Sequence, residues 1–176
     1  MNTTRAVFLL GVVFSIGITI GAVARGTAPD ASIYRGKAKA EAGKALLDLA
    51  RTQAGKGSWE QIAVGRVYYL AGMKAEGQAL FDAAVSKKID SSDWVRIGRV
   101  YWEAKEADKA FAAFDHALQA KPKDAPWLAE VGAYYNLRGN RGKADELFDR
   151  SFQQEPDEVW TTVNMAGSYF GVEPLR

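Results

Sequence analysis

Two arginine–aromatic pairs are the residues of this chain best suited to recognising another molecule. Arg66 is followed three residues later by Tyr69, and Arg99 is followed three residues later by Trp102. A guanidinium group can bind a carboxylate through two parallel hydrogen bonds, and an aromatic ring beside it offers flat apolar area. Because positions three apart share one face of a helix, the two pairs predict a binding strip that recurs along the chain.

Neighbouring positions with i, i+4 and i+7 spacing extend this strip along further helices. Among them, Ala129 and Ala133 are small enough to leave room for a partner's side chain. The alternative is that Arg66 and Arg99 only pair with acids such as Glu103 and solvate this face. The predicted partner-binding residues are Ile62, Arg66, Tyr69, Val95, Arg99, Trp102, Ala129, Ala133, Asn136 and Phe170.

A catalytic site is the least favoured use of the polar residues. The single histidine, His116, follows Asp115, which suggests a base and its orienting group. Neighbours in a helix point about 100° apart, however, so the two side chains do not face each other. No cysteine, second histidine or nucleophile motif accompanies them. We therefore expect a protein that is not an enzyme and that has neither a cofactor nor a metal site; a hydrolase would lose its activity in His116→Ala.

The composition fits one globular unit behind a leader segment. The chain has 176 residues, of which 48% are hydrophobic, and its formal net charge is +2. Its 23 basic and 21 acidic residues are interleaved, so nothing favours a nucleic-acid partner. The absence of cysteine excludes disulfides and thiolate metal sites.

The elements that must position the strip follow from a motif that recurs three times between residues 58 and 158. Copies of the motif begin 33 or 34 residues apart. The offsets i, i+3, i+4 and i+7 predict a first helix in each copy, and the proline in two of them ends a second helix. In the middle copy the motif residues are Trp94, Ile97, Gly98, Tyr101, Ala110, Phe114 and Pro122.

A glycine stands at the same point of each predicted first helix, at Gly65, Gly98 and Gly132. Glycine inside a helix costs about 1 kcal/mol relative to alanine, so its recurrence indicates a steric need. We expect the second helix of each copy to approach closely there, at small residues such as Ala110 and Ala144. The recurring phenylalanines of the second helices should wedge between neighbouring copies.

This motif resembles the tetratricopeptide repeat, a helix–turn–helix unit. The resemblance implies an all-α solenoid with about three repeats, a half-repeat and a capping helix. It also implies that extended peptides or proteins bind along a concave groove lined by the first helices. Some members clamp a terminal carboxylate with lysine and asparagine, but Ile62, Arg66 and Val95 stand at those positions, so we do not expect that ligand.

The motif and the composition divide the chain into seven predicted segments. They are a transmembrane helix or signal peptide (1–24), a linker (25–32), a degenerate opening half-repeat (33–57), the first, second and third repeats (58–90, 91–124 and 125–158), and a capping helix with its tail (159–176).

Residues 6–24 form an uncharged apolar run of 19 residues. As a helix it would extend about 28 Å, close to the ~30 Å hydrocarbon thickness of a bilayer, which favours a retained transmembrane helix. Arg5 before the run and the small residues ending at Ala24 also fit a cleaved signal peptide. The lysines and arginines after the run favour cytoplasmic repeats, whereas the short tail before it favours export. We expect a membrane anchor with periplasmic repeats; the alternatives are a cytoplasmic location or secretion after cleavage near Ala24.

The function expected from these features is an adaptor or scaffold that binds a peptide or protein partner near a membrane. The alternative is a structural subunit or assembly factor of a larger envelope membrane complex.

Overall fold

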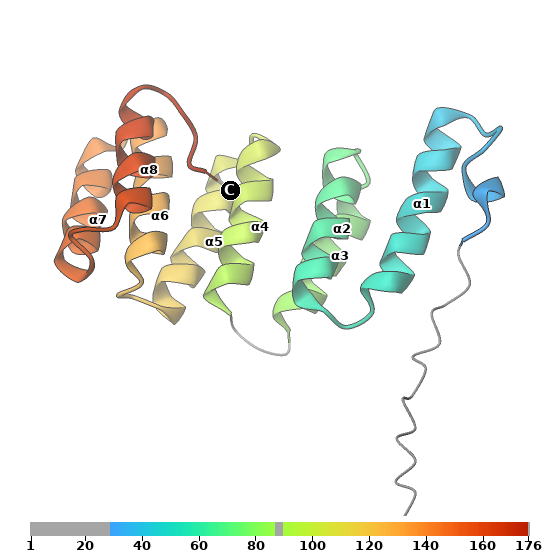
Figure 1. Cartoon of the computed structure of the whole chain (residues 1–176), viewed down its shortest axis with the longest axis horizontal. Helices are drawn as coiled ribbons and strands as arrows, with labels where there is room; N and C mark the ends of the chain where they lie inside the picture. Colours follow the sequence, from blue (N-terminus) through green and yellow to red (C-terminus); the bar gives the residue numbers. More distant parts are fainter. Residues whose placement is uncertain (1–28, 87–89, 176) are drawn as a thin grey trace, which may run out of the picture. The chain divides into compact units, whose positions relative to one another are not determined.

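The computed structural model describes residues 29–86 and 90–175, and every regular element in these ranges is helical (Figure 1). The chain divides into a unit Met1–Ala31 and a unit Ser32–Arg176, and the second unit carries all the α-helices described. The elements are η1 (Ala31–Ile33), α1 (Lys39–Ala54), α2 (Ser58–Leu70), α3 (Lys74–Val85), α4 (Ser91–Glu103), α5 (Ala107–Ala120), α6 (Ala125–Leu137), α7 (Arg141–Gln154) and α8 (Val159–Tyr169).

The predicted anchor or signal peptide, residues 1–24, lies outside the described residues. In the ranges that are described, no helix combines the length and the apolar character that crossing a bilayer requires.

The helices of the second unit pack as hairpins. The contacts of α2 with α3, of α4 with α5 and of α6 with α7 are the most extensive, and a three-residue turn joins the helices of each pair. In addition, α1 packs on α2 and α8 packs on α6. The intervals 58–90, 91–124 and 125–158 therefore each hold one helix pair, in an all-α arrangement of stacked repeats.

The first helices of the three pairs, α2, α4 and α6, and also α8, which we count as a fourth first helix, each end in the same turn, in which one residue adopts a left-handed backbone. Three of these residues are glycines, Gly72, Gly139 and Gly171, with φ between +76° and +89°. The fourth is Lys105, with φ of 64°, a conformation that costs a side-chain-bearing residue roughly 1 kcal/mol. The next amide in the chain bonds the carbonyl five residues back, which closes the turn.

The recurring glycines admit a phenylalanine ring from the paired helix. A Cβ on Gly65 would lie 2.7 Å from the Phe81 ring, and one on Gly132 would lie 2.7 Å from the Phe148 ring. A Cβ on Gly98 would overlap Phe114 in the same way. The predicted close approach is thus confirmed. The group nearest each added Cβ is the phenylalanine ring, and in the first pair the small residue Gly77 also opposes Gly65, with its carbonyl oxygen 3.1 Å from that Cβ.

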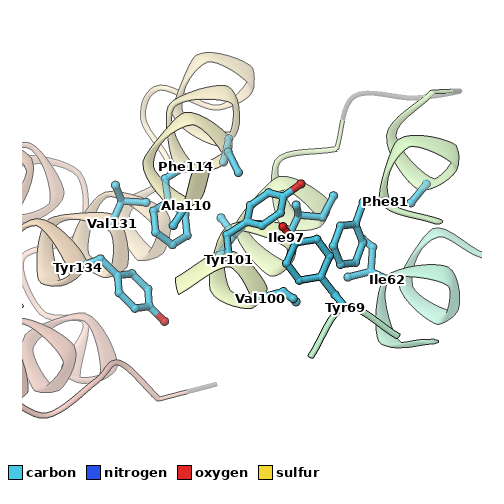
Figure 2. Close-up of a cluster of buried hydrophobic side chains, with 14 of the residues drawn as sticks. Ile62, Tyr69, Phe81, Ile97, Val100, Tyr101, Ala110, Phe114, Val131 and Tyr134 are labelled. Carbon is cyan, nitrogen blue, oxygen red and sulfur yellow. The ribbon is translucent and has the colours of Figure 1, made fainter. Parts of the chain in front are cut away.

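The same phenylalanines reach the next repeat. The ring of Phe81 lies 5.8 Å from that of Tyr101 in α4, and the ring of Phe114 lies 4.9 Å from that of Tyr134 in α6. Figure 2 shows the rings of Phe81, Tyr101, Phe114 and Tyr134 in the buried cluster. The predicted wedging of phenylalanines between repeats is therefore confirmed for Phe81 and Phe114.

Tyrosine hydroxyls also connect each first helix to the helix before its repeat. Each donates a hydrogen bond to a carboxylate or amide oxygen on that helix, at 2.7 to 3.5 Å. The pairs are Tyr68–Asp48, Tyr101–Gln78, Tyr135–Asp115 and Tyr169–Asp145. Since α1 provides Asp48, it stands to α2 as the later second helices stand to the first helices that follow them.

Candidate partner-binding site

Three side-chain bridges connect successive first helices. Arginine–glutamate pairs span the first two junctions, and an amide–hydroxyl pair spans the third. Their hydrogen bonds are 2.9 Å from Arg66 Nε to Glu103 (α2–α4), 2.6 Å from each of two guanidinium nitrogens of Arg99 to Glu130 (α4–α6), and 2.9 Å from Asn136 Nδ2 to Ser168 Oγ (α6–α8). The arginines of the predicted strip therefore do pair with acids, and Arg66 pairs with Glu103 itself.

The two arginine pairs differ in their exposure to solvent. The side chains of Arg66 and Glu103 are 42% and 29% exposed, whereas those of Arg99 and Glu130 are 18% and 4% exposed. Water screens the first pair far more than the second. The α2–α4 junction thus keeps a charged group at an open surface, and the α4–α6 junction encloses its charges.

A hollow of about 210 Å³ opens between α2 and α4 beside the Arg66–Glu103 pair. Its apolar lining comes from Trp59, Ile62, Ala63 and Val100, and charged side chains form the remainder. This mixture suits a ligand group with an apolar body and a polar end. We call it the α2–α4 hollow; its lining residues are Trp59, Ile62, Ala63, Arg66, Arg96, Arg99, Val100 and Glu103.

Trp59 stands at the mouth of the α2–α4 hollow and is 63% exposed. The guanidinium carbon of Arg96 lies 5.8 Å from its ring centroid, close enough for a cation–π interaction. Arg96 also donates a 2.9 Å hydrogen bond to the Ser92 hydroxyl and lies 3.4 Å from the Asp93 carboxylate. These contacts hold Arg96 in place, while most of the indole surface stays accessible.

The Glu106 carboxylate, which directly precedes α5, is hydrogen-bonded to side chains of α2, α3 and α5. Glu106 accepts a hydrogen bond from Lys109 (2.8 Å), from the Tyr69 hydroxyl (2.6 Å) and from Lys74. Led by the bond from Lys109, these bonds lower the pKa of the Glu106 carboxyl from 4.5 to about 2. Burial, with the bond to Glu106 adding to it, raises the pKa of the Tyr69 phenol. Tyr69 is therefore a buried link between helices.

Of the ten predicted binding residues, Ile62, Arg66 and Arg99 come together at the α2–α4 hollow. Four others lie inside the packing between helices, where a partner does not reach them. These are Tyr69, Val95, Ala129 and Ala133.

The room expected beside Ala129 and Ala133 is filled by the chain itself. Both alanines are fully buried in a small core cluster with Phe148 and Met165, and Met165 belongs to α8. Because alanine has no bulk beyond Cβ, α8 packs directly on α6 at this point.

The remaining three predicted residues lie apart from the α2–α4 hollow. The Trp102 indole donates a 3.0 Å hydrogen bond to Glu173, which follows α8. Asn136 bonds Ser168, as described above, and Phe170 is 85% exposed at the end of α8.

Five of the eight lining residues of the α2–α4 hollow were not among the predicted ones, and Trp59 and Arg96 are the two that matter most for binding. Trp59 stands outside the repeated motif, so periodicity does not point to it. Arg96 occupies a position at which the other repeats carry Ala63 and Glu130. A repeat position at which three copies differ in charge is the one sequence signal that could have found it.

Asp115 and His116 contact different neighbours and do not form a pair with each other. The imidazole of His116 stacks on the Trp94 indole at 4.5 Å, whereas Asp115 accepts a hydrogen bond from Tyr135. Within residues 29–86 and 90–175, no cluster of three or more His, Asp or Glu side chains could hold a metal ion.

One of three comparisons with known proteins, the one with solved structures, agrees with this architecture. No protein-family model matches the chain, and no curated protein matches it. Among solved structures, the fold is similar to the crystal structure of MamA, with a TM-score of 0.50 and 19% sequence identity over 66% of this chain and 68% of that chain. At this identity the likeness concerns the fold alone, and together with the paired helices it supports a fold of the tetratricopeptide type.

Proposed function

We propose that this chain is a non-enzymatic scaffold that binds a peptide or protein partner at the α2–α4 hollow. The observation that carries the proposal is Trp59, a large aromatic ring left mostly exposed beside an apolar hollow and a row of arginines. Tryptophan and arginine are the side chains that most often dominate protein–protein binding energy. A partner segment with an apolar side chain and a carboxylate would match this lining.

We further propose that this scaffold is held at a membrane, with its repeats in the periplasm. The uncharged run 6–24, which is long enough to anchor the chain in a bilayer, supports the membrane location. An anchor would keep the α2–α4 hollow close to partners in the same membrane and raise their effective concentration without any added contact.

A second candidate function is that of a structural subunit or assembly factor in a larger envelope complex. It is favoured by apolar side chains that α8 and the next residue expose to solvent. Several large apolar side chains exposed on one short helix are typical of an interaction surface. They are Val159, Trp160, Val163 and Phe170.

Site-specific photo-crosslinking in the native cells separates the two functions. A photoreactive amino acid replaces Trp59 in one variant, Trp160 in a second, and the exposed Gln119 of α5 in a control. The scaffold function predicts a discrete crosslinked partner from position 59 and none from position 119. The Arg96→Glu change should remove that product.

Crosslinks from position 160 alone would favour the structural role. Equal labelling from positions 59 and 119 would contradict a binding site at the α2–α4 hollow.

A further inference from the structure

The residues that follow α8 fold back across the first helices. Gly171 reverses the chain, and the Val172 amide then bonds the Gly167 carbonyl at 2.9 Å. Figure 1 shows this segment leaving the end of α8 and running toward α4. Glu173 there accepts the hydrogen bond from the Trp102 indole, although the two residues are 71 positions apart in sequence.

Two further observations show that the segment is held against the rest of the chain. Pro174 is buried, and the Leu175 amide donates a 3.0 Å hydrogen bond to the Asn164 side chain. The backbone amide, the proline ring and the glutamate are thus each recognised separately. This is how an extended peptide is bound, by backbone bonds for affinity and side-chain contacts for specificity.

The Trp102 indole, which donates the hydrogen bond to Glu173, is held by neighbouring rings that do not belong to the segment. The Trp102 ring lies 5.1 Å from that of Tyr134 and 6.1 Å from that of Phe111, and Tyr134 is fully buried. A donor held by packing loses little freedom when it binds a ligand.

Two basic side chains lie beside Trp102, and both also border a second hollow that Glu106 and Asp108 line. Lys105 and Arg138 line a hollow of about 140 Å³ together with Trp102 and Ala107. Neither cation forms an ion pair within the described ranges. Lys105 also holds the left-handed turn position at which the other first helices have glycine, so a cation is kept there at a conformational cost.

We propose that Trp102, Lys105, Arg138 and Asn164 form a seat for an extended acidic segment of a partner protein that contains a Glu-Pro pair. Residues 171–175 of the chain occupy this seat and must leave it when the partner binds. A second carboxylate next to the partner's Glu-Pro pair would meet Lys105 and Arg138. This inference rests on the proposed function and names the chemistry of the partner.

A labelled peptide with the sequence of residues 170–175 tests the seat in the full chain. The double change Glu173→Gln, Pro174→Gly should release the chain's own segment, and Glu155→Gln is the matched control because Glu155 is an exposed acid outside the seat. By fluorescence polarisation, the released variant should bind the peptide at least ~10-fold more tightly than the natural chain, because an attached segment competes at an effective concentration of about 1 mM. The control should bind the peptide as weakly as the natural chain does.

Changes in the peptide test the recognition chemistry. Replacing its glutamate, as Glu173→Gln, should weaken binding about 10-fold through loss of the charged hydrogen bond to Trp102. The peptide change Val172→Glu should strengthen binding, and that gain should disappear in Lys105→Gln, Arg138→Gln protein. If the double change disturbs folding, as checked by circular dichroism, Glu173→Gln alone should give a smaller shift in the same direction.

Equal peptide binding by the natural and folded released chains would overturn the inference, as would binding that ignores the glutamate. Either result alongside intact crosslinking from position 59 would leave the scaffold function standing. Peptide binding without crosslinking from position 59 would instead exclude the α2–α4 hollow as the binding site and support the seat.

Discussion

The α2–α4 and α6–α8 junctions use the same repeat positions in opposite ways. Arg66 at the first junction corresponds to Ala133 at the last, and Ile62 corresponds to Ala129. The arginine bridges to Glu103 and borders an open hollow, whereas the alanines let α8 pack directly on α6. In a stacked repeat, small side chains therefore bring the next helix closer, and long charged ones leave space for a ligand.

The largest change in the free energy of unfolding is expected at Arg99, which bridges α4 and α6 between these two junctions. Arg99→Ala leaves the Glu130 carboxylate buried without its partner, which should lower the free energy of unfolding by about 3 kcal/mol. Arg66→Ala breaks a solvent-exposed pair and should cost about 0.5 kcal/mol. Urea unfolding of the two variants measures both values. Adding Glu130→Gln to Arg99→Ala should recover part of the loss, and equal costs at the two arginines would contradict the difference in enclosure.

Overpacking should distinguish the closed junction from the open one. Ala129→Leu inserts three carbons where α8 contacts α6, and we expect a loss of roughly 2 kcal/mol. Ala63→Leu adds the same bulk on the wall of the α2–α4 hollow and should change stability by less than about 0.5 kcal/mol. Thermal unfolding of the matched pair reports the difference. A tolerated leucine at position 129 would show that α8 does not fill this space.

Low pH should weaken the hydrogen bonds of Glu106 to α2 and α3. It should not affect the Asn136–Ser168 bond between α6 and α8, which carries no charge. Because the Glu106 pKa is lowered from 4.5 to about 2, its carboxylate stabilises the fold above pH 4.5, and this contribution is lost as the pH falls from 4.5 toward 2. Glu106→Gln should therefore be less stable than the natural chain at neutral pH, with the difference shrinking in acid. Urea midpoints at pH 7, 4 and 3 measure it. Asn136→Ala should instead give a difference that does not vary with pH over this range.

The smallest effect on stability is expected at Trp59, the residue on which the proposed binding site depends most. Trp59→Ala removes a mostly exposed ring and should change the free energy of unfolding by less than about 0.5 kcal/mol. Met165→Ala, which removes a buried side chain of the closed junction, should cost about 2 kcal/mol or more. A large loss in Trp59→Ala would make that tryptophan a packing residue.

The repeats could be predicted from the sequence because their spacing is set by short-range helix geometry. Gly98 and Tyr101 recur at fixed offsets, and the structure places both in the packing of a helix pair. The binding strip was harder to predict, because exposure depends on how closely the next first helix packs. Ala133 and Arg66 share a repeat position, and only the packing of α8 on α6 distinguishes them. The contact of Glu173 with Trp102 joins distant parts of the chain through a turn that no period encodes.

Cysteine accessibility tests the contrast between the two junctions most directly, because the natural chain contains no cysteine. Single variants Ala63→Cys and Ala133→Cys place one thiol at each junction with little added bulk. We predict that a bulky maleimide labels position 63 at nearly the rate of the unfolded chain, whereas position 133 reacts only when urea unfolds the protein. Similar labelling rates at both positions in the folded protein would contradict the account.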